Sequence, residues 1–126
     1  MKEIIYTSKA PSPIGPYSQA IKIGGFLYLS GQIAIDVESG ELVMESVKQE
    51  AKQIMKNLEA VLEAGNSDFS KVIKTSIFLS DMSLFNDVNE IYGGYFTDHF
   101  PARETVAVAG LPKGVNVEIS MIASSI

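Results

Sequence analysis

One segment, between Ser46 and Gly65, constrains the fold of this chain more than any other. Its apolar residues recur at steps of three and four positions and so form one stripe along a helix. They are Val47, Ala51, Ile54, Leu58, Val61 and Leu62. Ser46 and Gln49 fit a capping box at the start of this helix, and Gly65 suits its C-terminal cap. A helix with a single apolar stripe needs one partner layer, which the rest of the chain must supply.

The partner layer is predicted to be a mixed β-sheet. Strands are expected at residues 4–6, 17–23, 26–30, 72–79, 104–109 and 115–123, with a proline-rich extended loop at 9–16 and a turn at 36–40. Gly24-Gly25 predicts a tight hairpin, because primed turns need positive φ. A second helix is expected after a cap at Asp81 or Ser83. Its apolar residues fall on one stripe and are Leu84, Phe85, Val88, Ile91, Tyr92, Tyr95 and Phe96. Gly93-Gly94 marks close packing, an end or a kink within this stripe.

This order of elements predicts a single α+β domain over residues 1–126, with both helices on one face of the sheet. One helix layer covers only one face of a sheet. The other face also needs cover, which oligomerisation would supply.

The composition excludes several functions. The chain of 126 residues has no cysteine, so thiol chemistry, disulfides and Cys/His zinc sites are excluded. Arg103 is the only arginine and His99 the only histidine, and the net charge is −5, which disfavours nucleic-acid binding. The longest charge-free apolar run, residues 23–35, is too short to span a membrane. The N-terminus does not resemble a signal peptide, so a cytoplasmic protein is expected.

Arg103 and Glu118 are the first candidates for a functional site. Arg103 follows Pro101 at the start of a strand, and a guanidinium there can hold a carboxylate through two hydrogen bonds. Position alone is equally compatible with a surface salt bridge. Glu118 interrupts an apolar strand and is able to act as a general base on water. The pattern alone fits a solvated outer face better.

Other candidates carry weaker signals. Tyr17 follows the proline loop and either contacts a ligand or fills the core. Ser30 and Gly31 end a strand, where glycine permits close approach of a ligand to the backbone, although such a pattern is more often just a turn. Thr105 shares a strand face with Arg103, either as a ligand donor or as an ordinary strand residue. His99 has no carboxylate at a recognisable spacing, which favours a structural or surface role.

Five segments together resemble one known family. They are IGPYSQA at 14–20, LSGQI at 29–33, VNEIY at 88–92, FPAR at 100–103 and VEI at 117–119. In this order they resemble the RidA family, also called YjgF/YER057c/UK114, of imine/enamine deaminases. The resemblance covers nearly the whole chain.

The resemblance implies a chorismate-mutase-like α+β fold assembled as a homotrimer, with clefts between neighbouring subunits. It implies a 2-iminobutanoate/2-iminopropanoate deaminase that hydrolyses small anionic 2-imino acids to 2-keto acids and ammonia. No metal or organic cofactor is expected. Two alternatives are a non-catalytic trimer that binds small ligands and, less favoured by the acidic composition, an endoribonuclease.

The resemblance also implies roles for individual residues. Arg103 corresponds to the arginine that holds the substrate carboxylate, and Glu118 to the glutamate associated with the attacking water. Tyr17, Ser30 and Gly31 correspond to residues that line the cleft or offer backbone groups to the ligand. Asn89 corresponds to an asparagine at the cleft edge. Many members have a cysteine where this chain has Thr105.

Overall fold

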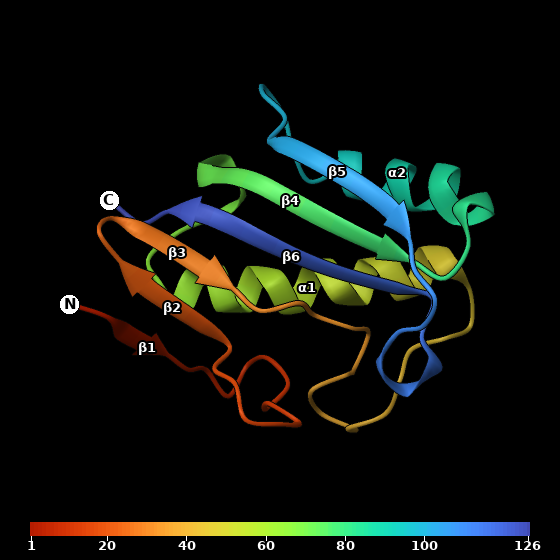
Figure 1. Ribbon diagram of the computed structural model, residues 1–126, viewed down its shortest axis with the longest axis horizontal. Coiled ribbons are helices and arrows are strands. Elements are labelled where there is room, and N and C mark those ends of the chain that lie inside the picture. Colours follow the sequence, from red (N-terminus) through yellow and green to blue (C-terminus); the bar gives the residue numbers. More distant parts are fainter.

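The computed structural model describes residues 1–126 as one six-stranded sheet and two α-helices (Figure 1). The strands are β1 (Glu3–Ile5), β2 (Ala20–Ile23), β3 (Phe26–Leu29), β4 (Val72–Leu79), β5 (Ala102–Ala107) and β6 (Val117–Ser124). The helices are α1 (Val47–Ala64) and α2 (Phe85–Gly93), and short 3-10 helices occur at Phe69–Lys71, Met82–Leu84 and Pro112–Gly114. Neither α1 nor α2 is long and apolar enough to cross a membrane.

The sheet is mixed, as the sequence predicts. Its strand order is β1-β2-β3-β6-β4-β5, and only the pairing of β4 with β5 is parallel. The parallel pair requires a crossover, and α2 supplies it. Gly24 and Gly25 have φ of 59° and 81° and close the predicted hairpin between β2 and β3.

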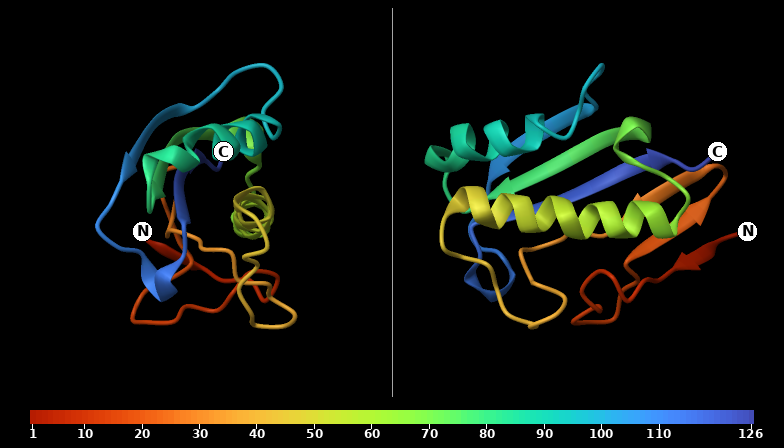
Figure 2. Two further views of the ribbon diagram at one scale, coloured as in Figure 1. Left: turned by 90° about the vertical axis from the view of Figure 1, so that its right-hand side faces the viewer. Right: turned by 180° about the vertical axis from the view of Figure 1, so that it is seen from behind.

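Both helices pack on one face of the sheet, which confirms the predicted α+β arrangement. In Figure 1 the sheet lies in front of the helices, and the view from behind in Figure 2 reverses this order. The apolar stripe of α1 meets alternate residues of β6, among them Val117, Ile119 and Met121, in one buried core. Burial of such side chains is the main source of stability here.

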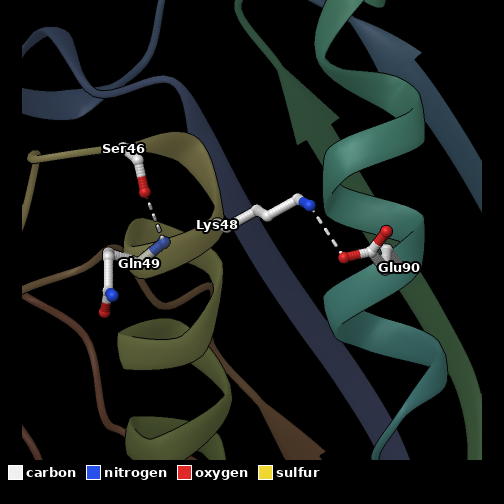
Figure 3. A network of polar contacts seen from close by, with 4 residues as sticks. All are labelled: Ser46, Lys48, Gln49 and Glu90. Atoms are coloured by element: carbon white, nitrogen blue, oxygen red, sulfur yellow. Dashed lines mark hydrogen bonds and ion pairs between the residues drawn. The ribbon is translucent and has the colours of Figure 1, made fainter.

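Polar contacts fix the start of α1 and its neighbour α2 (Figure 3). The Ser46 hydroxyl accepts a hydrogen bond from the backbone N–H of Gln49 at 3.1 Å, which confirms the predicted N-cap. The reciprocal bond of a capping box is absent, because the Gln49 side chain points away. Lys48 pairs with Glu90 of α2 at 2.8 Å on the surface, where solvent and salt screen the attraction and the pair adds little to stability.

Gly65 is the C-terminal cap of α1, as predicted, but a glycine is needed there for a reason other than a left-handed backbone. Its φ is −94°, and the left-handed residue after α1 is Asn66, with φ of 60°. A Cβ atom at Gly65 would lie 2.5 Å from Cδ2 of Leu27 on β3. Glycine is therefore required for the contact between the end of α1 and the sheet rather than for backbone freedom.

Several element boundaries also differ from the sequence prediction, among them the starts of β2 at Ala20 and of β6 at Val117. Asp81 caps the 3-10 helix Met82–Leu84, so α2 begins only at Phe85, and it ends at the predicted glycine pair. Strand β5 begins at Ala102, two residues earlier than expected, because parallel pairing with Lys74 of β4 starts immediately after Pro101. Arg103 consequently lies inside the strand.

The sheet face opposite the helices carries several exposed apolar side chains, with the Lys74–Glu104 ion pair and Ser76 among them. Its exposed residues include Ile4, Ile23, Phe26, Tyr28 and Val106, each more than 40% accessible. The register places Ile4 opposite Ile21 and Tyr28 opposite Ile122, so these side chains share that face. We call this surface the open face. In the single chain it has no covering layer, as the sequence predicts.

Candidate functional site

Glu118 projects from β6 onto the open face. Its neighbours Val117 and Ile119 are fully buried on the helix side, and alternation turns the Glu118 side chain to the opposite side. It lines a cavity of about 360 Å³ together with Ile14, Tyr17, Ser30, Gly31, Ile33 and Pro112. Four of the residues predicted from the sequence, Tyr17, Ser30, Gly31 and Glu118, therefore meet in one cavity.

The Glu118 carboxylate occupies the space that a side chain at position 31 would fill. A Cβ atom built on Gly31 would overlap Oε2 of Glu118 and lie 2.9 Å from its Cδ. Burial beneath this strand end raises the pKa of the Glu118 carboxyl above the ordinary glutamate value. A carboxyl with a raised pKa is a better proton acceptor from water than an exposed one.

Tyr17 and Ser30 shape the cavity wall through local hydrogen bonds. The Ser30 hydroxyl donates to the Ser18 carbonyl at 2.6 Å, so its proton is used within the chain. The Tyr17 hydroxyl accepts from the backbone N–H of Ile14 at 3.3 Å. Tyr17 is 47% exposed, which excludes the alternative that its ring fills the core.

Arg103 lies in a second cavity, on the helix side of the sheet. Its Cζ atom is 5.2 Å from the ring centroid of Tyr92 and 5.5 Å from that of Phe85. Cation–π contacts of this kind hold a guanidinium without using its N–H donors. The Arg103 side chain makes no hydrogen bond within the chain and takes part in neither of the two ion pairs, so the surface salt bridge considered above is absent.

Tyr92 is fixed beneath Arg103. It is 4% exposed, and its hydroxyl donates to Oγ1 of Thr75 at 2.9 Å. Burial raises the pKa of the Tyr92 phenol, which keeps it a neutral donor. Arg103 thus rests on a rigid aromatic platform with its charge available.

Two further predicted residues share the surroundings of Arg103. Asn89, from α2, lines the same cavity of about 340 Å³, with Phe100 and Pro101 opposite. Thr105 follows Arg103 on the same strand face, and its Oγ1 is buried without a hydrogen-bond partner. A buried hydroxyl without a partner is uncommon and is suited to pairing with a bound molecule.

The predicted site residues therefore form two groups in one chain, on opposite faces of the sheet. Arg103 pairs with Thr75 of β4, whereas Glu118 pairs with Phe78 of the same strand. Positions three apart along a strand face opposite sides. We name each cavity after the type of its charged side chain: the cavity of Glu118, an acidic residue, is the acid half-site, and that of Arg103, a basic residue, is the base half-site.

Sequence reasoning missed part of each half-site. Phe85 and Tyr92 belong to the apolar stripe of α2 and were expected only in the core. Their spacing of seven residues, two helical turns, places both rings on one side of the helix, but nothing in the pattern pairs them with Arg103. In the acid half-site, Ile33 comes from the loop after β3 and Pro112 from the 3-10 helix before β6, and the sequence does not specify where these connections run.

His99 belongs to neither half-site. It lines a small separate cavity of about 160 Å³ with Ser70, Asp98 and aromatic residues of the loop after α2. No group of three or more His, Cys, Asp or Glu side chains in the chain is arranged to hold a metal ion.

Fold and site together define an α+β protein with a mixed sheet and two half-sites on opposite sheet faces. A family model described as Endoribonuclease L-PSP matches residues 7–125. The human protein named 2-iminobutanoate/2-iminopropanoate deaminase is 49% identical over 123 residues, which cover 98% of this chain and 90% of that protein.

Solved structures of related proteins have the same fold. RidA from an Antarctic Psychrobacter species has a TM-score of 0.93 and 41% identity, covering 97% of this chain and 98% of that one. Escherichia coli TdcF with bound serine has a TM-score of 0.93 and 35% identity, with the same coverage of 97% and 98%. The chain belongs to the RidA (YjgF/YER057c/UK114) family.

Proposed function

We propose that this protein is a 2-iminobutanoate/2-iminopropanoate deaminase, which hydrolyses small 2-imino acids to 2-keto acids and ammonia. The observation that carries the proposal is Arg103, the only arginine, whose guanidinium is held on Tyr92 and Phe85 with no internal carboxylate partner. The human relative is named for this activity, and the TdcF structure contains serine, a small molecule with a carboxylate.

The proposed chemistry uses each half-site for one task. Arg103 binds the substrate carboxylate through two N–H donors and fixes the adjacent imine carbon. Thr105 and Asn89 lie beside Arg103 and are able to donate to the same ligand. Glu118 orients a water molecule and accepts its proton as the oxygen bonds to the imine carbon.

The reaction then completes without an oxidant or a cofactor. Glu118 passes the proton it took from water to the imine nitrogen, which gives a carbinolamine with a hydroxyl and an amino group on the carbon. Ionised Glu118 then accepts the hydroxyl proton and delivers it to the amino nitrogen, the carbon–nitrogen bond breaks and ammonia leaves as the carbonyl forms. The predicted absence of a metal and cofactor accords with this scheme.

A complete site requires two copies of the chain, because Arg103 and Glu118 face opposite sides of one sheet. We propose a homotrimer of the single domain 1–126 in which the open face is buried and the acid half-site of each subunit meets the base half-site of its neighbour. The exposed Phe26 and Tyr28 on the open face favour this assembly, since apolar surface of this kind marks an interface. Sedimentation at micromolar concentration tests it, and a monomer mass of 13.6 kDa would overturn it.

The deaminase activity is tested by adding the purified protein to an amino-acid oxidase or threonine dehydratase reaction and following release of the keto acid. We expect acceleration by the wild type and none by Arg103→Ala. Lys52→Ala, an exposed change on α1, is the matched charge control. An unchanged rate with Arg103→Ala would remove the carboxylate-binding role.

The same assay separates the alternatives. Binding of keto acids in calorimetry without acceleration would identify a ligand-binding trimer that does not catalyse the reaction. Ribonuclease activity that persists through purification and disappears in a Glu118 or Arg103 variant would favour RNA cleavage, against which the net charge of −5 argues. The cytoplasmic location stays a prediction.

A further inference from the structure

Glu50 is a carboxylate inside the hydrophobic core. It lies in the first turn of α1 with no exposed surface, on a helix whose other buried residues, apart from Asn57, are apolar. Burying a carboxylate has a large desolvation cost unless hydrogen bonds compensate it. The stripe of α1 would pack equally well with an apolar residue here, so the position calls for a specific explanation.

Three N–H donors surround this carboxylate, all from the start of β6. Oε2 accepts from the backbone N–H of Asn116 at 2.9 Å and from that of Val117 at 3.1 Å. Oε1 accepts from Nδ2 of Asn116 at 2.9 Å. Glu50 thus binds two consecutive peptide groups, which fixes the direction in which the strand begins.

The next residue along the chain is Glu118. Because Val117 is held from the helix side, the side chain that follows it is directed to the open face and into the acid half-site. Asn116 is held from a second direction as well, since its carbonyl accepts from the N–H of Ser80 at the end of β4, at 2.9 Å. The strand start is therefore fixed by both α1 and β4.

The opposite wall of the acid half-site is attached to the same helix. Asn57 is 1% exposed and lies seven residues after Glu50, two turns along the same side of α1. Its Nδ2 donates to the carbonyls of Ile33 at 3.1 Å and Ile35 at 2.9 Å. Ile33 lines the acid half-site. The two buried polar residues of α1 thus hold the two walls of one cavity.

We propose that Glu50 is a positioning residue for Glu118, and that α1 serves as the support that sets the geometry of the acid half-site. Glu50 does not touch the substrate; it acts through the Asn116–Val117 peptide groups. The proposal rests on the proposed deaminase function, because it assigns Glu118 the task of orienting water. Arg103 lies in the other half-site and is not affected by Glu50.

This separation predicts a specific kinetic signature. Loss of the Glu50 acceptors should disturb Glu118 and leave binding of the substrate carboxylate intact. Glu50→Leu, which has a similar volume and no acceptor, should lower kcat on the order of a hundredfold, since catalytic groups displaced by about 1 Å lose this much. KM should change less than about twofold.

Glu50→Gln provides the conservative rescue. Its Oε1 can accept from both backbone N–H groups, and its amide N–H can donate to Oδ1 of Asn116 once that amide turns over. The Ser80 hydroxyl, which now donates to Oδ1 of Asn116 at 3.3 Å, can instead accept from the turned amide. We expect kcat of Glu50→Gln within about threefold of the wild type.

The experiment measures kcat and KM of wild type, Glu50→Leu and Glu50→Gln in the coupled assay, with Val61→Ala as the matched control. Val61 is fully buried on the same helix and touches neither half-site, so its truncation reports the effect of lost stability alone. Amide hydrogen exchange at Val117 provides a readout independent of activity. Exchange should accelerate in Glu50→Leu and stay slow in Glu50→Gln and Val61→Ala.

If Glu50→Leu does not fold, Glu50→Asp replaces it, because the shorter carboxylate keeps the charge and withdraws the acceptors from β6. Its expected loss of kcat is about tenfold. A kcat for Glu50→Leu or Glu50→Asp equal to that of Val61→Ala would overturn the positioning role while leaving the deaminase function standing. A wild type without deaminase activity would instead refute the proposed function, and the positioning role with it.

Discussion

The Glu118 carboxylate packs directly against Gly31, in the space where any other residue would have its side chain. A methyl group at position 31 would overlap Oε2 of Glu118. Gly31→Ala is therefore expected to push this carboxylate out of place and to lower kcat/KM on the order of a hundredfold. Steady-state kinetics in the coupled assay measure the effect.

Gly110→Ala is the control for this change. A Cβ atom there meets nothing within 4 Å, so activity should equal that of the wild type. Equal activity of both alanine variants would contradict the role given to the Glu118 carboxylate.

The raised pKa of Glu118 predicts a pH dependence of the reaction. Glu118 accepts a proton only when it is ionised, so kcat/KM should fall with decreasing pH through the pKa of this carboxyl. Since burial raises that pKa, the fall should begin at a higher pH than for an exposed glutamate. A pH–rate profile checks this, and an acidic limb at or below the ordinary glutamate value would contradict it.

The same carboxyl should make the folded protein less stable as the pH rises. The folded state binds the Glu118 proton more readily than the unfolded chain, so its contribution to stability is complete below the unfolded pKa and is lost as the pH rises through the folded one. Glu118→Gln should therefore have a higher Tm than the wild type at pH 7. The difference should shrink at a pH near 4, where both side chains are uncharged. A Tm difference independent of pH would show that titration of Glu118 is not its cause.

Mixed oligomers test whether each site combines two subunits. Arg103→Ala lacks a base half-site and Glu118→Gln lacks an acid half-site, so each alone should be inactive. Co-refolding equal amounts of the two variants should restore about a quarter of the wild-type sites. In a random mixture, this is the fraction of sites in which one subunit supplies an intact Arg103 and its neighbour an intact Glu118. Activity that stays at the level of the separate variants would place Arg103 and Glu118 in different sites.

Gly65→Ala is predicted to destabilise the fold without any role in the site. The added methyl would lie 2.5 Å from the Leu27 side chain and would force the end of α1 away from β3. Overpacking of this kind costs about 1–3 kcal/mol of the free energy of unfolding. Urea denaturation measures it, with Gly93→Ala as the control, because a Cβ atom at Gly93 has no neighbour within 4 Å.

Much of the fold follows from local pattern. The stripe and caps of α1, the glycine hairpin and the β-branched, breaker-free segment of β4 each have a physical cause within a few residues, and all were predicted. The exceptions depend on contacts distant in sequence. Gly65 is required by Leu27, and the early start of β5 follows from its pairing with β4.

The site was only partly accessible from the sequence. The residues of each half were named, yet their division between two sheet faces depends on the register of β4 with β5 and β6, which pattern alone does not fix. Phe85 and Tyr92 were predicted as core residues because a helical stripe does not distinguish a ring that fills the core from one that supports a guanidinium. Glu50 gave no signal, since a glutamate in a first helical turn is usually explained by the helix dipole.

The opposite orientation of Arg103 and Glu118 also has a genetic consequence. If neighbours share each site, a cell that expresses a copy altered in both halves beside the normal one loses function out of proportion to gene dosage. In a cyclic trimer, each copy contributes to two sites. A copy defective in one half-site inactivates one of them. A copy defective in both half-sites inactivates two, because the intact half-sites of its normal neighbours then lack a working partner. Alleles that damage different halves would instead complement one another.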